Sequence, residues 1–109
     1  MSPERSGGLP TGALVKACFS GKYTQAEVGK MLNGNGGFNA YVGSNDMRDL
    51  LKMIEEGDKK AEAVVDAFHY QLCKEIGAMS VVLGGKVDQI ILTGGIAYSA
   101  KTQADMKNA

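Results

Sequence analysis

The first group with potential chemistry is a basic, glycine-flanked segment near the start of the chain. Arg5 is followed by Ser6, Gly7 and Gly8, which predicts a flexible polar loop. An arginine guanidinium binds phosphate oxygens in a bidentate manner, so this loop could hold a phosphate group. A solvated arginine is the commoner case near a terminus, and the residue types by themselves favour that simpler interpretation.

A second candidate lies at residues 90–99, where an apolar, β-branched run leads into Gly94 and Gly95. Glycines after a buried strand let the backbone approach a ligand. The N-terminus of a following helix offers free N–H groups and a positive dipole end to an anion or nucleotide. Ligands of α/β proteins also collect at the carboxyl ends of strands. A tight turn without any ligand explains the same residues equally well.

The third candidate is an acidic and a basic residue at a predicted helix start. Asp46 could accept hydrogen bonds from a ribose hydroxyl, and Arg48 could stack on or bond a nucleotide. An acidic residue in the first turn is also the ordinary compensation of the helix dipole. Residue types alone favour this structural interpretation.

Composition excludes several classes of protein. The 109 residues carry 12 basic and 12 acidic side chains, whereas nucleic-acid binders usually have a basic excess. No apolar run reaches the roughly 18 residues of a membrane span. Cys18 and Cys73 have no partner spacing and indicate reduced thiols, with Cys73 predicted to pack beside an apolar stripe. His69 is the only histidine and is expected at the surface or half-buried, not as a metal ligand.

Helical patterns must position these candidates. Thr24 and Glu27 form a predicted capping box, and Ser44 or Asn45 could cap a helix over residues 46–56. Asp58 can cap the longest helix. Helices are predicted over residues 10–21, 24–33, 46–56, 58–83 and 98–109, whereas residues 38–43 are of uncertain type.

The longest predicted helix carries an apolar stripe that should lie in the core: Ala61, Val64, Val65, Phe68, Leu72, Ile76, Met79 and Leu83. Residues 86–92 then predict a buried strand. Such a strand needs neighbours for its backbone, and the chain offers at most one other weak strand. These patterns indicate a piece of a larger α/β protein.

Taken together, the segments resemble the C-terminal domain of the acetate kinase and butyrate kinase family. The likeness rests on residues 5–7, Ser44–Asp49, the long helix and Val87–Ile96, in this order and spacing, and it covers nearly the whole chain. Residues 93–99 read Thr-Gly-Gly-Ile-Ala-Tyr-Ser and look more like butyrate kinase than acetate kinase. The latter carries Gly-Glu-Asn in place of Ala97-Tyr98-Ser99, so the side-chain contacts there are expected to differ.

The resemblance implies a fold that is mainly α with few strands, as part of an α/β domain of the actin-like ATPase fold. It implies that residues 1–109 are a single fragment of the C-terminal nucleotide-binding domain of a carboxylate kinase. Such enzymes transfer a phosphoryl group from ATP to a short-chain acid and need Mg²⁺, whose ligands should lie outside this chain. Arg5 matches the family arginine that contacts the transferring phosphoryl group. Implied nucleotide contacts are Asp46, Met47, Arg48, Gly94, Gly95, Ile96, Ala97, Tyr98 and Ser99.

The expected function is therefore part of a butyrate kinase, cytoplasmic and homo-oligomeric, without nucleic-acid or membrane partners. The isolated chain is expected to be inactive, because phosphoryl transfer needs both sides of the cleft. An acetate, propionate or branched-chain carboxylate kinase is an alternative within the same class. A non-catalytic helical interaction module is the alternative from another class.

Overall fold

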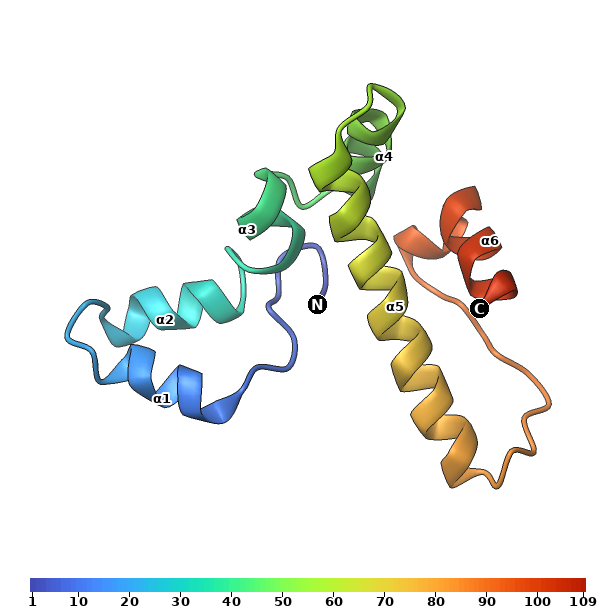
Figure 1. Cartoon of the computed structure of the whole chain (residues 1–109), viewed down its shortest axis with the longest axis horizontal. Helices are drawn as coiled ribbons and strands as arrows, with labels where there is room; N and C mark the ends of the chain where they lie inside the picture. Colours follow the sequence, from blue (N-terminus) through green and yellow to red (C-terminus); the bar gives the residue numbers. More distant parts are fainter. The chain divides into compact units, whose positions relative to one another are not determined.

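The structure is a computed structural model that describes all residues from Met1 to Ala109. Its regular structure is helical, apart from one isolated antiparallel bridge between Arg5 and Asn33. Figure 1 shows the elements in order: α1 (Thr11–Cys18), α2 (Gln25–Leu32), α3 (Gly37–Val42), α4 (Met47–Glu55), α5 (Lys59–Val82), the 3-10 helix η1 (Gly95–Tyr98) and α6 (Ala100–Asn108). The chain divides into two compact units, Met1–Val64 and Val65–Ala109. No helix combines the length and apolar character that crossing a bilayer requires.

Local capping sets the start of α2 and α4. The Thr24 hydroxyl accepts from the Glu27 N–H at 3.2 Å, and the Thr24 N–H donates to the Glu27 carboxylate, which confirms the predicted capping box. The cap of α4 is Asp46, so the predicted Ser44 or Asn45 is wrong by one or two residues. The Ser44 hydroxyl instead accepts from the Asp46 N–H at 3.2 Å and donates to the Asp49 side chain at 2.6 Å.

The segment of uncertain type, residues 38–43, is largely helical. Helix α3 ends at Val42 with Gly43 as its C-cap, and its Phe38 is fully buried. A helix of six residues is less than two turns, so its 3.6-residue period is too short to read from the sequence.

Helix α5 is capped as predicted, but only its first half is covered. The Asp58 carboxylate accepts from the N–H groups of Lys60 and Ala61 at 2.9 and 3.0 Å. The stripe is buried from Ala61 to Phe68, whereas Met79 is 57 % exposed. The core expected around Met79 and Leu83 is therefore wrong, because no other element covers this end of the helix.

The strand predicted over residues 86–92 is not formed. The segment is irregular and makes no ladder, and Figure 1 shows it as a long trace between α5 and α6. Its Ile91 is 81 % exposed. A strand exists only through hydrogen bonds to a neighbour, and the structure contains no other strand to pair with it.

His69 differs from its prediction as well. Its side chain was expected at the surface or half-buried, yet it is only 5 % exposed. The reason is a polar face of α6 that lies against it, which the pattern of α5 alone cannot indicate.

Candidate functional site

The Arg5 segment is tied to the end of α2 by backbone hydrogen bonds. The Ser6 N–H donates to the Leu32 carbonyl at 3.0 Å. The N–H groups of Gly34 and Gly36 both donate to the Glu4 carbonyl, at 2.8 and 3.0 Å. The segment predicted as a flexible loop is therefore fixed by hydrogen bonds. Its backbone partners are in residues 32–36, which lie far away in the sequence.

The Arg5 side chain is exposed but oriented. Its Nε donates to the Asn33 side-chain oxygen at 3.4 Å, next to the backbone bridge between the same two residues. This contact uses the inner edge of the guanidinium and leaves Nη1 and Nη2 for an incoming oxyanion. Asn33 was missed by the sequence analysis, since a polar residue after a helix carries no signal for a partner 28 positions away.

Two glycines make the close approach of these segments possible. A Cβ on Gly37 would overlap the Ser2 carbonyl oxygen and lie 2.8 Å from the Arg5 carbonyl oxygen. A Cβ on Gly36 would lie 2.7 Å from the Ser6 nitrogen. Gly37 also has a positive φ of 57°, which side-chain-bearing residues rarely adopt. These positions fit only glycine, so the geometry of Arg5 depends on them.

Asp46 and Arg48 form an exposed, bidentate ion pair at the start of α4. The Arg48 Nε and Nη2 donate to the Asp46 carboxylate at 3.0 and 2.7 Å, and the Arg48 backbone N–H donates to the same carboxylate at 2.9 Å, so Asp46 caps the helix. These hydrogen bonds favour the charged form and lower the pKa of Asp46 to about 2. The Met47 side chain is buried in the core, so only the Met47 backbone is available to a ligand.

We expect Asp46 to titrate at about pH 2, against an ordinary value of 3.8. Because the folded pKa lies below the unfolded one, the stabilisation exists above pH 3.8 and is lost as the pH falls through 2. The Asp46 carboxyl carbon shift, followed by NMR in Arg48→Gln, should report a pKa moved back toward 3.8.

The matched control is Lys59→Gln, which removes an equally exposed cation from its 2.8 Å pair with Glu62. It should leave the Asp46 titration unchanged. A pKa of Asp46 near 3.8 in the unaltered chain would contradict the prediction.

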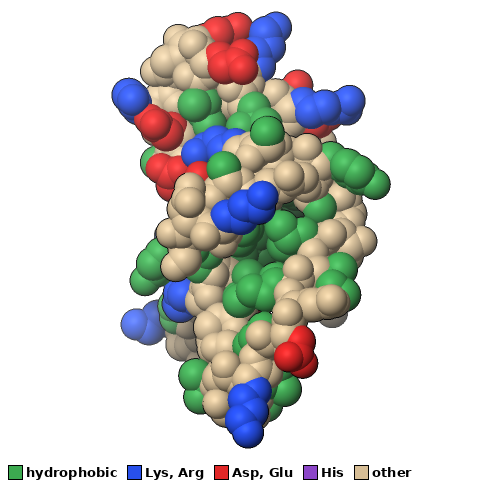
Figure 2. All heavy atoms as spheres, turned by 90° about the vertical axis from the view of Figure 1, so that its right-hand side faces the viewer, with side chains coloured by type: hydrophobic (Ala, Val, Ile, Leu, Met, Phe, Trp, Pro, Cys, Tyr) green, Lys and Arg blue, Asp and Glu red, His purple; other side chains and the backbone are tan.

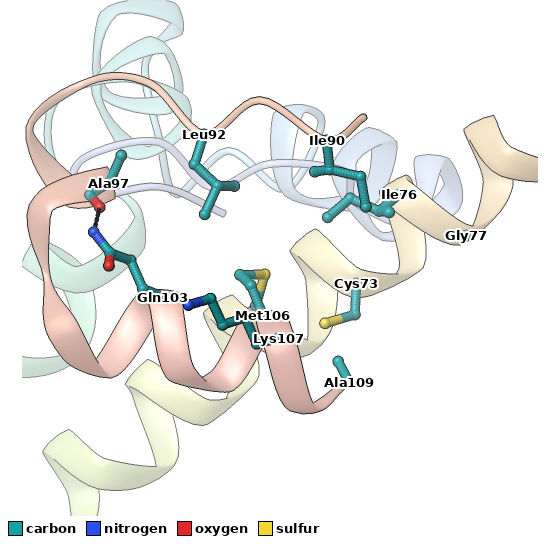
Figure 3. A pocket seen from close by; sticks show the side chains of 10 residues that line it. All are labelled: Cys73, Ile76, Gly77, Ile90, Leu92, Ala97, Gln103, Met106, Lys107 and Ala109. Atoms are coloured by element: carbon teal, nitrogen blue, oxygen red, sulfur yellow. Dashed lines mark hydrogen bonds between the residues drawn. The ribbon is translucent and has the colours of Figure 1, made fainter. Parts of the chain in front are cut away.

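The glycine turn before α6 leads directly into helix, as its pattern predicted. Gly94 has a φ of 86° and precedes η1, and Ser99 ends η1 and caps α6. The Ser99 hydroxyl accepts from the Thr102 N–H at 3.3 Å. The Gln103 amide donates to the Ala97 carbonyl at 2.8 Å, which ties this turn to α6 (Figure 3). Residues 94–99 are named the glycine loop below.

An apolar cavity of about 700 Å³ lies in the second unit, beside the glycine loop. Figure 3 shows Leu92 and Met106 of α6 facing each other across it, and Ile90 and Ile76 of α5 line it as well. Figure 2 shows apolar side chains gathered in a hollow on this side of the molecule. The remaining residues that line the cavity are Cys73, Gly77, Ala97, Gln103, Lys107 and Ala109. Cys73 is therefore half-buried at its wall.

The predicted site residues fall into both units. Arg5 and the Asp46–Arg48 pair belong to Met1–Val64, and the glycine loop belongs to Val65–Ala109. No hydrogen bond or ion pair joins Arg5 to Asp46 or Arg48. No three His, Cys, Asp or Glu side chains are grouped as metal ligands.

A family model and individual known proteins point to the same protein family. The model of the acetokinase family matches residues 1–107. The chain is 50 % identical over 107 residues to a probable butyrate kinase of Clostridium botulinum strain Alaska E43, covering 98 % of the chain and 30 % of that protein. It is 55 % identical over 98 residues to butyrate kinase 2 of Clostridium acetobutylicum, covering 90 % of the chain and 28 % of that protein.

Solved structures agree with the sequence comparison. Acetate kinase of Porphyromonas gingivalis superposes with a TM-score of 0.87 at 25 % identity, over 96 % of the chain and 27 % of that structure. A propionate kinase from Francisella tularensis superposes with a TM-score of 0.80 at 26 % identity, over 95 % of the chain and 27 % of that structure. The mainly helical architecture thus matches part of the actin-like ATPase fold, as expected. The chain spans about 30 % of the length of the curated relatives. The chain belongs to the acetokinase family.

Proposed function

We propose that this chain is part of a butyrate kinase, which transfers a phosphoryl group from ATP to butyrate and forms butyryl phosphate. The observation that carries the proposal is its 50–55 % identity to butyrate kinases over nine-tenths or more of the chain. Identity to the matched acetate and propionate kinase structures is 25–26 %. In this proposal residues 1–109 belong to the C-terminal nucleotide-binding domain of a cytoplasmic, homo-oligomeric enzyme.

Arg5 is the proposed catalytic residue. Phosphoryl transfer spreads negative charge over the equatorial oxygens of the transferring group, and a fixed cation offsets this charge. With Nε held by Asn33, the outer edge of the guanidinium can meet two of these oxygens. Bound Mg²⁺ would neutralise phosphate charge. The residues described here do not form a site for it, so its ligands would lie elsewhere in the enzyme.

The remaining predicted residues would hold the nucleotide. Backbone atoms of the glycine loop can approach a ligand closely, because Gly94 and Gly95 have no side chains. Arg48 is 89 % exposed and can stack on a base while Asp46 keeps it in place. The Asp46 carboxylate is already engaged by Arg48, so a ribose hydroxyl would share that acceptor. The full set is Asp46, Met47 (through its backbone), Arg48, Gly94, Gly95, Ile96, Ala97, Tyr98 and Ser99.

The test is an acyl phosphate assay on the full-length enzyme that carries this chain, with ATP and acetate, propionate, butyrate or isobutyrate. We expect the highest kcat/KM with butyrate. A clear preference for acetate or propionate would replace the proposed substrate, and no activity with any acid would overturn the proposed function.

The isolated 109-residue chain should form no butyryl phosphate under the same conditions. Arg5 and the glycine loop supply only part of the groups that must surround the reacting atoms. Turnover by the purified chain above the rate of a buffer blank would contradict this expectation.

A further inference from the structure

We propose that His69 is a positioning residue for the nucleotide: it orients α6, and α6 in turn holds the glycine loop. The inference rests on the proposed role of that loop in nucleotide binding. His69 itself is distant from the loop in sequence and is not among the residues that the family resemblance singles out.

The imidazole of His69 contacts α6 at two positions one turn apart. Its Nε2 lies 3.0 Å from the Thr102 Oγ1, and its Nδ1 lies 2.7 Å from the Asp105 Oδ2. The Nε2 contact has hydrogen-bond geometry, whereas the Nδ1 contact is a close approach of the ring to the Asp105 carboxylate without that geometry. Two contacts at successive turns define both the rotation of α6 and its position along α5.

The surroundings make these contacts specific. His69 is 5 % and Thr102 2 % exposed, so neither polar group can turn to water instead. The Asp105 carboxylate also accepts from the Lys101 ammonium at 3.0 Å, and Lys101 lies 3.7 Å from Asp66 of α5. The Lys101 hydrogen bond lowers the pKa of Asp105 and so favours the charged form, which can only accept hydrogen bonds.

Thr102 connects His69 with the glycine loop. Its side chain contacts His69, and its backbone N–H meets the hydroxyl of Ser99, the last residue of the loop. The neighbouring Gln103 holds the Ala97 carbonyl at 2.8 Å (Figure 3). A rotation of α6 would therefore move two residues of the loop together, although His69 touches neither of them.

The experiment measures the full-length kinase with His69→Leu and Thr102→Val, which each remove the polar contact at nearly constant volume. We expect the KM for ATP to rise about fivefold, with kcat and the KM for the acid within about twofold of the unaltered enzyme. Thr102→Ser keeps the hydroxyl and should restore the KM for ATP. The matched control, Val65→Ala, opens a fully buried site on α5 without touching α6 polar groups and should lower the Tm alone.

A second readout is amide hydrogen exchange of residues 94–99. Exchange should be faster in His69→Leu than in Val65→Ala, whether or not the loop binds ATP. Equal exchange in these two variants overturns the positioning role, and so does an unchanged KM for ATP in His69→Leu when Gly95→Ala raises that KM. Gly95→Ala tests the nucleotide role separately: an unchanged KM for ATP there would count against the proposed function of the loop, and the exchange result would still decide the role of His69.

Discussion

Arg5→Ala in the full-length kinase is expected to lower kcat for butyryl phosphate formation about 10³-fold. An arginine that offsets transition-state charge in phosphoryl transfer contributes roughly 10³–10⁵ in kcat. The KM for ATP should change much less, because the charge that Arg5 meets develops on the transferring group and not on the adenosine. Steady-state kinetics with saturating ATP and butyrate provide the measurement.

Two variants separate the charge of Arg5 from its orientation. Arg5→Lys keeps a cation but not the planar pair of donors, and it should recover only part of the lost rate. Asn33→Ala keeps the guanidinium and removes the acceptor of Nε, so we expect a smaller loss, about tenfold. A kcat of Arg5→Ala within about tenfold of the unaltered enzyme would exclude the catalytic role.

Gly37→Ala should unfold the Met1–Val64 unit. The added Cβ would overlap the Ser2 carbonyl oxygen and press on the Arg5 carbonyl at 2.8 Å, both of them backbone atoms that cannot turn away. Left-handed backbone costs roughly 1–2 kcal/mol for a residue with a Cβ. Steric overlap in a packed site adds about 1–3 kcal/mol or more. Together these two costs lower the free energy of unfolding by about 2–5 kcal/mol, which is comparable to the whole stability of a small domain. Urea unfolding followed by circular dichroism measures it.

Two other glycines are matched controls for the Gly37 prediction. Gly43 has a similar positive φ of 75° but open space around its Cβ position, so Gly43→Ala should cost only the backbone strain. Gly12 lies in α1 with nothing within 4 Å, and Gly12→Ala should stabilise the chain by about 0.5–1 kcal/mol. Equal losses for Gly37→Ala and Gly43→Ala would show that the close approach to the Arg5 segment is not the cause.

Local signals allowed much of the fold to be predicted. The capping box of Thr24 and Glu27 and the cap of Asp58 depend on residues three or fewer positions apart, and both are present. The glycine loop and the helix after it are also set by neighbours in sequence, through Gly94 and the Ser99 cap. These features can be predicted from the sequence because the interacting groups lie within one turn of each other.

Features that depend on distant partners could not be predicted. The burial of His69 follows from Thr102 and Asp105, which lie more than 30 positions away on another helix. Arg5 and Asn33, which are also in contact, lie 28 positions apart in the sequence. The strand pattern of residues 86–92 describes side chains suited to a sheet, yet a ladder also needs a second strand. Catalytic and nucleotide roles of the named residues remain predictions for the assays above.

The unpaired segment after α5 has a consequence for how such a chain behaves in solution. Ile90, Ile91 and Leu92 expose β-branched and apolar side chains to water, and their backbone is not paired with a strand. Such a short run without proline is a template for intermolecular cross-β stacking. Lys86 and Asp88 stand just ahead of it, and charged residues in such flanking positions disfavour intermolecular stacking. Pairing of this segment with a neighbouring strand would cover its edge and lower its tendency to aggregate.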